Sequence, residues 1–266
     1  MTGAGTSSTD MEDISRFFRD HDIEEYAVVS ASSLHAPVGR RPGDFIPSAQ
    51  TMILFGAEMD ERLFSGTNDE ISLKVRAFLN KIRRVEDDLC SALQREGFEA
   101  SPVRSVILQG GTIKGMLSLA HCAADAGLGV IGDNRLLISP RFGSRIGLGA
   151  VVTIKKMEET LRPESSIEGC NHCNKCIRAC PEHALAQGTL DIFSCRNVTG
   201  SVPGFMRPVV FRFIRFGERF PFSRQILNFL ASRKVNACAD CLVSCPRFHG
   251  DDSDRADQRG GRRTVG

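Results

Sequence analysis

The residues with the clearest capacity for chemistry are cysteines, of which the chain has ten. Four of them follow the spacing C-x2-C-x2-C-x3-C and end in Pro181, and three more follow a related spacing that ends in Pro246. The two sets are Cys170, Cys173, Cys176 and Cys180, and Cys238, Cys241 and Cys245. Thiolates at this spacing hold iron–sulfur clusters in bacterial ferredoxins, where the fourth cysteine of a set binds the other cluster. The sequence therefore predicts two [4Fe–4S] clusters.

The crossing rule assigns four ligands to each predicted cluster, with Cys195 completing the second set. Cluster I is expected to bind Cys170, Cys173, Cys176 and Cys245, and cluster II to bind Cys180, Cys195, Cys238 and Cys241. Two structural zinc sites with four cysteines each are the alternative, although zinc modules usually set two cysteine pairs well apart. Disulfides are disfavoured because the chain shows no secretory signal.

Other thiol and imidazole groups have simpler interpretations. Cys90 and Cys122 lie on predicted helices, where buried core thiols are expected and a redox or catalytic thiol is the alternative. His172 lies within the first cysteine set. Because cysteine fills the ligand positions, we expect His172 to hydrogen-bond near the sulfur atoms rather than bind metal.

Composition places the chain among ordinary globular proteins of one large or two modest domains. Its 266 residues are 41% hydrophobic and 25% charged. The net charge of +2 gives no general case for nucleic-acid binding. No uncharged apolar run approaches the roughly 18 residues of a membrane span, and the first nine residues lack an apolar signal core. We therefore expect a cytoplasmic protein.

The elements that must position the cysteines divide the chain into an α+β domain, residues 10–160, and a double-cluster domain, residues 161–249. The ends, 1–9 and 250–266, are expected to be disordered. Periodicity predicts helices at 10–21, 67–97 and 116–126, and strands at 26–30, 51–56, 103–108, 136–138 and 150–154. Thr67 and Glu70 form a predicted capping box for the long helix, whose charged residues, including Glu86, fit a solvated face.

Two segments carry a family resemblance. Residues 40–56 read RRPGDFIPSAQTMILFG, and residues 126–144 contain AGLGVIGDN followed by LLISPRFGS. They resemble two conserved blocks of the family of epoxyqueuosine reductase and the corrinoid reductive dehalogenases. The second block in that family is A-G-L-G-x-I-G-K-N-x-L-L-I-x-P-x-x-G-S, and the cysteine sets follow it at the expected distance.

The resemblance implies an N-terminal α/β sandwich-like domain of the nitroreductase-like, cobalamin-binding type, followed by a ferredoxin-like domain with two [4Fe–4S] clusters. It implies that electrons pass from a low-potential donor of ferredoxin or flavodoxin type through cluster II and cluster I to cobalamin, and from there to a small-molecule substrate. The residues that it suggests for cofactor binding are Gly127, Gly129, Gly132, Ser139, Arg141 and Gly143.

The three glycines of the second block also match a dinucleotide-binding fingerprint formally. That fingerprint must follow a strand and open a helix, whereas these glycines follow the predicted helix 116–126. Two interpretations stay open: a tight helix-to-strand turn, or a turn that approaches a corrinoid or another flat cofactor.

Catalytic candidates are the titratable residues around the second block, namely Lys114, His121, Asp125 and Asp133. His121 and Asp125 are four residues apart on one predicted helix, where they form either a proton relay or an ordinary helix pair. The family's acidic proton donor has no counterpart in residues 109–115, and Asp133 stands where the family has Lys. The family's tRNA-binding helical repeats have no counterpart after Cys245, so we do not expect tRNA as a partner.

A basic, phenylalanine-rich insertion occupies residues 200–235, between Cys195 and Cys238. A helical lid over the clusters is the simplest interpretation. The alternatives are docking of an acidic electron donor, peripheral contact with an anionic membrane through residues 203–234, and RNA binding.

The combined prediction is an iron–sulfur oxidoreductase that passes single electrons through two clusters to a cofactor or substrate in the N-terminal domain. The alternative is a non-catalytic, ferredoxin-like protein that transfers electrons or handles a corrinoid.

Overall fold

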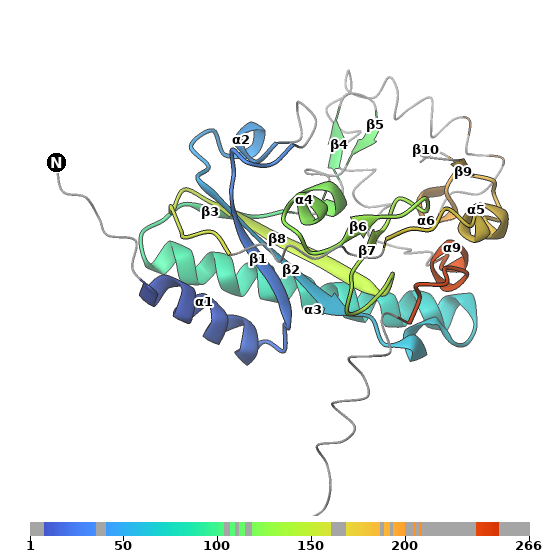
Figure 1. Cartoon of the computed structure of the whole chain (residues 1–266), viewed down its shortest axis with the longest axis horizontal. Helices are drawn as coiled ribbons and strands as arrows, with labels where there is room; N and C mark the ends of the chain where they lie inside the picture. Colours follow the sequence, from blue (N-terminus) through green and yellow to red (C-terminus); the bar gives the residue numbers. More distant parts are fainter. Residues whose placement is uncertain are drawn as a thin grey trace, which may run out of the picture.

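The computed structural model of the chain describes residues 8–35, 41–103, 107–109, 112–114, 119–160, 169–186, 189–191, 194–199, 205, 208 and 238–249. Its fold is α+β, as predicted: an antiparallel sheet carries helices on both faces, and the short cysteine-bearing elements gather at one end (Figure 1). Of the segments predicted to be disordered, 1–9 and 250–266, residues 1–7 and 250–266 fall outside the described residues, whereas Ser8 and Thr9 belong to a helix. The insertion 200–235 also falls outside them, apart from Phe205 and Pro208.

The central sheet has four strands in the order β1-β2-β8-β3. They are β1 (Glu25–Ser30), β2 (Thr51–Glu58), β8 (Ile146–Thr153) and β3 (Ala100–Pro102). All pairings are antiparallel, with Ile53 of β2 opposite Val28 of β1 and Val151 of β8. Strand β2 lies inside the sheet and is buried from Thr51 to Ala57, which explains why it reads as a continuous apolar run.

Two hydrophobic clusters lie on opposite faces of this sheet, because alternate side chains of a strand point to opposite sides. On one face, Ile53 and Phe55 belong to a cluster with residues of α1 (Ser8–Asp20) and α3 (Asn68–Arg95). On the other face, Met52 and Leu54 belong to a cluster with residues of α4 (Leu119–Asp125). Figure 1 shows α1 and α3 below the sheet and α4 above it.

Helix α3 confirms the predicted capping box. The Thr67 side chain accepts a hydrogen bond from Glu70 N, and Glu70 Oε2 accepts one from Thr67 N at 2.8 Å. Gly97 follows the helix with a φ of +90°, a conformation that glycine adopts without strain. The solvated position predicted for Glu86 is wrong: its side chain is 3% exposed, and its Oε1 accepts a hydrogen bond from Ala150 N of β8.

Two predicted strands have different bounds in the structure. Of the expected strand 103–108, only residues 107 and 108 belong to a described strand, β4 (Ile107–Gln109), which pairs with β5 (Thr112–Lys114), while β3 ends before it at Pro102. Strand β8 begins at Ile146, four residues before the predicted start, and includes Gly147 and Gly149. A Cβ atom at Gly147 would lie 2.2 Å from the Phe78 ring of α3, so the helix packs directly against the strand backbone there.

The remaining elements are short. They include α2 (Pro42–Phe45), the 3-10 helix η1 (Glu61–Phe64), and the hairpin of β6 (Val130–Ile131) and β7 (Leu137–Ile138). The cysteine-bearing part contains α5 (Lys175–Ala179), β9 (Leu185–Ala186), β10 (Thr189–Leu190), α6 (Arg196–Thr199) and α9 (Asp240–Val243). None of the helices that the structure describes is long and apolar enough to cross a membrane.

Candidate iron–sulfur centre

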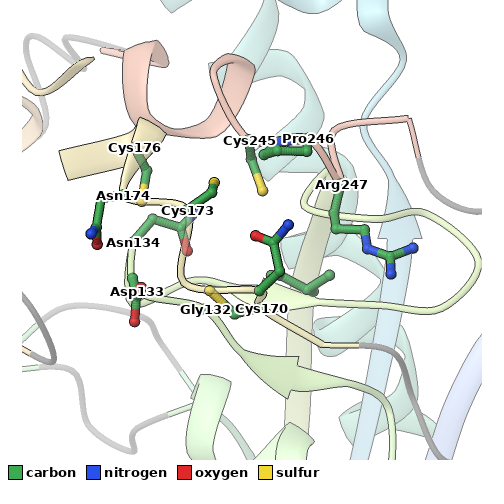
Figure 2. Close-up of a pocket in the computed structure, with 12 residues that line it drawn as sticks. Gly132, Asp133, Asn134, Cys170, Cys173, Asn174, Cys176, Cys245, Pro246 and Arg247 are labelled. Atoms are coloured by element: carbon green, nitrogen blue, oxygen red, sulfur yellow. The ribbon is translucent and has the colours of Figure 1, made fainter. Parts of the chain in front are cut away.

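A hollow between the sheet region and the cysteine-bearing elements brings together four thiols from two distant segments. Its lining includes the cysteines at positions 170, 173, 176 and 245 and the loop that follows β6, Gly132 to Asn134. In Figure 2 the sulfur atoms of these four cysteines border one common space. They are the four thiols predicted to bind cluster I; their ligation of iron stays a prediction.

Backbone conformation explains how closely spaced cysteines reach the same hollow. His172 and Asn174 have φ angles of 53° and 58°, in the left-handed region, so the chain turns on either side of Cys173. Helix α5 begins directly afterwards and carries Cys176. Cys245 comes from a separate turn after α9, where its N–H donates to Leu242 O.

The electrostatics of this group favour a bound cation. Burial raises the pKa of the Cys176 thiol, and the nearby Cys245 and Cys170 raise it further. Burial also raises the pKa of the Cys245 thiol, with added effects of Cys170 and Cys173. Four close thiolates repel one another, so their joint deprotonation requires compensating positive charge. The donor set therefore fits a thiolate-bound metal cluster.

The other four cysteines form a second group. Cys180 is buried with Ala184 and Leu185, and the thiols of Cys195 and Cys241 pack against this small cluster. Burial raises the pKa of Cys241 to about 12, with further contributions from neighbouring Cys238, Cys195 and Cys180. The structure thus brings together the thiols predicted for cluster II, and their ligation is likewise untested.

The Asn197 side chain holds the backbone of Cys238 in place beside this second group. Its Oδ1 accepts from Cys238 N at 2.6 Å, and its Nδ2 donates to Cys238 O at 3.1 Å. These two bonds join segments 41 residues apart in sequence.

Asp133 lies at the rim of the first hollow, 3.1 Å from His172 Nδ1 through either carboxylate oxygen. The Asp133 side chain is 11% exposed, whereas the His172 side chain is 74% exposed. With the Cys170 thiol, these two groups could also hold a single metal ion. The structure therefore places Asp133 and His172 beside the Cys170 thiol, and the hydrogen bond expected between His172 and sulfur stays a prediction.

The other catalytic candidates lie elsewhere or outside the described side chains. Asp125 accepts a hydrogen bond from the backbone N–H of His35 at 2.8 Å, and His121 Nε2 lies 3.3 Å from Arg135 Nη2. The backbone of Lys114 belongs to β5, but its side chain is outside the described part. No contact in the described part of the chain supports a catalytic role for Lys114, His121 or Asp125.

Contacts and backbone angles within the chain explain why the predicted cofactor-binding positions are glycines. Gly127 ends α4 with a φ of +82°. A Cβ atom at Gly129 would lie 2.3 Å from the Ile138 carbonyl oxygen, and one at Gly132 would lie 2.8 Å from Asn134 Oδ1. Their geometry matches the helix-to-strand turn, and it supplies no observation in favour of a corrinoid.

Ser139, Arg141 and Gly143 form a turn that is tied to β1. Ser139 Oγ donates to the Glu25 carboxylate, with distances of 2.8 and 3.0 Å to its two oxygens, and the Arg141 guanidinium pairs with Glu24. The backbones of Ser139 and Gly143 also form an isolated antiparallel β-bridge, and Gly143 has a φ of +59°. Burial raises the pKa of Glu25 to about 7, against the opposing effect of the Ser139 hydrogen bond.

Sequence reasoning missed three residues at this centre. Asn134 borders the hollow and is 4% exposed. Ser144 and Arg145 hold the segment that carries Cys245: Ser144 N donates to Arg247 O at 2.8 Å, and Arg145 Nε donates to Phe248 O at 2.7 Å. Asn134 and Ser144 were visible only as members of the resembling block, and the sequence left Arg145 open between anion binding and surface charge, whereas the structure buries it.

Comparison with known proteins agrees with the resemblance seen in the sequence. No family model matches the chain. A stretch of 139 residues is 30% identical to epoxyqueuosine reductase from Listeria monocytogenes, covering 52% of this chain and 31% of that protein. A stretch of 140 residues is 32% identical to the Bacillus anthracis epoxyqueuosine reductase, with the same coverages of 52% and 31%. The match thus spans about a third of the length of these curated relatives.

Solved structures share the fold over most of the chain. Epoxyqueuosine reductase from Streptococcus thermophilus matches with a TM-score of 0.56 and 19% identity, over 91% of this chain and 66% of that one. A reductive dehalogenase, whose structure suggests a mechanism for B12-dependent dehalogenation, matches with a TM-score of 0.55 and 15% identity, over 86% of this chain and 38% of that one.

Proposed function

We propose, from the premise that this chain is a distant homologue of the epoxyqueuosine reductases, that it is a two-cluster iron–sulfur oxidoreductase. The observation that carries the proposal is the gathering of eight cysteines into two groups of four, each drawn from separate segments. The spacing of these cysteines matches that of ferredoxins. The likeness of fold to two kinds of reductase supports a role in reduction rather than in structure alone.

The chain's own residues would hold the two clusters close together. When bound, a [4Fe–4S] cluster takes up and releases one electron at a time. Cys176 belongs to the first group and lies in α5, while Cys180 belongs to the second group and follows the same helix. Four residues of helix advance about 6 Å, so these two thiols belong to adjacent sites. This proximity suits single-electron transfer between them.

A corrinoid, a low-potential ferredoxin or flavodoxin, and a small-molecule substrate complete the proposal, and they rest on the resemblance alone. The glycines assigned to cofactor binding are in close contact with the chain itself, so no described contact tests a corrinoid. A different substrate from epoxyqueuosine is proposed because residues 109–115 contain no carboxylate.

Metal analysis of the full chain, purified without oxygen, tests the proposal directly. We expect about eight iron and eight sulfide per chain, the content of two cubanes. Replacing Cys245 with Ala removes one thiol of the first group and should lower the iron content by up to about half. Cys122 is buried in the apolar cluster around α4 and belongs to neither group, so Cys122→Ala is the matched control and should keep the full iron content.

Stoichiometric zinc without sulfide, or equal iron loss in both variants, would contradict the proposal. Turnover then separates the enzyme from a non-catalytic electron carrier. Cluster-loaded protein, supplied with a low-potential reductant and tested with cobalamin and a panel of reducible small molecules, should consume reductant continuously if it is an oxidoreductase. A single stoichiometric reduction in every case would favour the carrier.

A further inference from the structure

The side chain of Asn134 is a feature of the first hollow that the thiols do not explain. It lies in the turn between β6 and β7, is 4% exposed, and borders the hollow together with Cys173 and Cys176. Figure 2 shows it on the side of the hollow next to Cys173. Among the residues that the structure describes, its Nδ2 atom is buried without a hydrogen-bond partner.

The orientation of this amide is fixed by its other end. Asn134 Oδ1 accepts a hydrogen bond from the backbone N–H of Leu136 at 3.1 Å. Turning the amide over would place its NH₂ group against that N–H, two donors facing each other, so the oxygen must stay where it is. The NH₂ group is therefore the end left without a partner.

Backbone hydrogen bonds in the turn around Asn134 hold its side chain in one position. Gly132 N donates to Leu136 O at 3.0 Å, and Arg135 N donates to Gly132 O at 2.9 Å. A Cβ atom at position 132 would lie 2.8 Å from Asn134 Oδ1, so the absence of a side chain at Gly132 makes room for the amide. A buried donor without a partner costs about 1–3 kcal/mol, and a rigid turn that maintains one implies an acceptor.

We propose that Asn134 Nδ2 donates a hydrogen bond to a sulfur atom of the cluster held by the cysteines at positions 170, 173, 176 and 245. This inference rests on the proposed function, because the acceptor is a thiolate or sulfide of that cluster. Asn174, which also borders the hollow, does not share the role. Its buried unpartnered atom is Oδ1, an acceptor, and its left-handed conformation already accounts for an asparagine there.

The hydrogen bond raises the reduction potential of this cluster. Reduction adds one electron from the external reductant to the cluster, no covalent bond forms or breaks, and the amide proton stays on Asn134. A donor to sulfur stabilises the more negative, reduced form more strongly than the oxidised form. Asn134 thereby makes this cluster easier to reduce than its thiolate ligands alone would.

The test is a potentiometric titration of the anaerobic, cluster-loaded full chain, followed by electron paramagnetic resonance. Asn134→Leu keeps the approximate size and removes the donor. At the wild-type midpoint potential, we expect its reduced-to-oxidised ratio to fall about tenfold, a shift of about 59 mV for a one-electron couple. The second cluster should not shift. Ile138→Val is the matched control, because Ile138 also lines the hollow and has no donor.

A second measurement covers the case in which Asn134→Leu fails to assemble the cluster. Wild-type protein labelled with ¹⁵N in asparagine side chains should show a nitrogen coupling to the reduced cluster in pulsed resonance spectra. An unshifted potential with full iron content, or no such coupling, overturns this inference and leaves the proposed function standing. Wild-type protein without iron and sulfide overturns both.

Discussion

In the sheet region, strands β1, β2 and β8 separate two clusters of buried apolar side chains, each covered by helices. In the described part of the cysteine-bearing region, the longest helix has five residues, and the hydrophobic cluster is small: Cys180, Ala184 and Leu185, with Leu242 and Phe248 buried outside it. A helix of that length is unstable by itself, and so few buried residues supply little hydrophobic free energy. The contrast indicates that burial stabilises the first region, and it predicts that the proposed clusters stabilise the second.

Removing the proposed metal should have the largest effect, and it should destabilise the cysteine-bearing region alone. After oxidation and chelation, amide hydrogens in residues 170–186 and 238–249 should exchange at least about a hundredfold faster, a loss of roughly 3 kcal/mol. Amides of β2 and β8 should keep their protection, because their hydrogen bonds and packing do not involve the cysteines. Hydrogen–deuterium exchange read by mass spectrometry measures both. Equal loss of protection in the two regions would show that they unfold as one unit.

The joint between the regions should give the next largest effect. Arg145 is 1% exposed, and its guanidinium donates to Met59 O at 2.8 Å and pairs with Glu58 at 2.8 Å, besides its bond to Phe248 O. Arg145→Met leaves buried carbonyl groups without donors, so we expect a loss of about 2–3 kcal/mol in the free energy of unfolding.

Iron analysis and urea unfolding together check this prediction, since the segment that carries Cys245 should also lose its attachment. The control is Arg62→Met: that side chain is 90% exposed and pairs with Asp60 at the surface, so the change should cost less than about 1 kcal/mol. If Arg145→Met unfolds at the same urea concentration as wild type and keeps all its iron, the joint contributes nothing.

The smallest expected effect concerns Glu25, a partly buried acid in the sheet region. The pKa of Glu25 is raised from 4.5 to about 7 in the folded protein, so the folded state holds its proton more tightly than the unfolded state. This contribution to stability is full below about pH 4.5 and is lost as the pH rises through about 7. Glu25→Gln cannot ionise, so above pH 7 it should be more stable than wild type by about 1–3 kcal/mol.

Urea unfolding at pH 5 and pH 8 measures this difference. The gain should be large at pH 8 and small at pH 5. Glu24→Gln is the control, because its side chain is 54% exposed and its pair with Arg141 lies at the surface. A gain that is the same at both pH values would mean that packing, and not ionisation, distinguishes the variant.

Local patterns in the sequence predicted much of the sheet region. The Thr67–Glu70 capping box and the apolar run of β2 depend on residues close together in the chain, and both are present as predicted. The start of β8 was missed because Gly147 and Gly149 weaken a strand pattern. They are glycines because Phe78 of α3 and the Phe55 ring occupy the space a side chain would need, which only the folded structure reveals.

Long-range contacts account for what the sequence did not predict at the centre. Glu86 looked like part of a charged helix surface, but its carboxylate meets Ala150 N across 64 residues of sequence. Arg145 meets Phe248 O across 103 residues. Cysteine spacing predicted which thiols would come together because metal ligands recur at short, regular intervals in a sequence. Hydrogen bonds between residues far apart in the sequence have no such regular spacing, so the sequence did not reveal them.

Helix α5 links the two groups of thiols directly along the chain. Cys176 is the second residue of α5 and Cys180 directly follows the helix, so this one turn carries a thiol of each group. One residue inserted between them would rotate one thiol by about 100° relative to the other. A change of length within this turn would therefore disturb both groups at once.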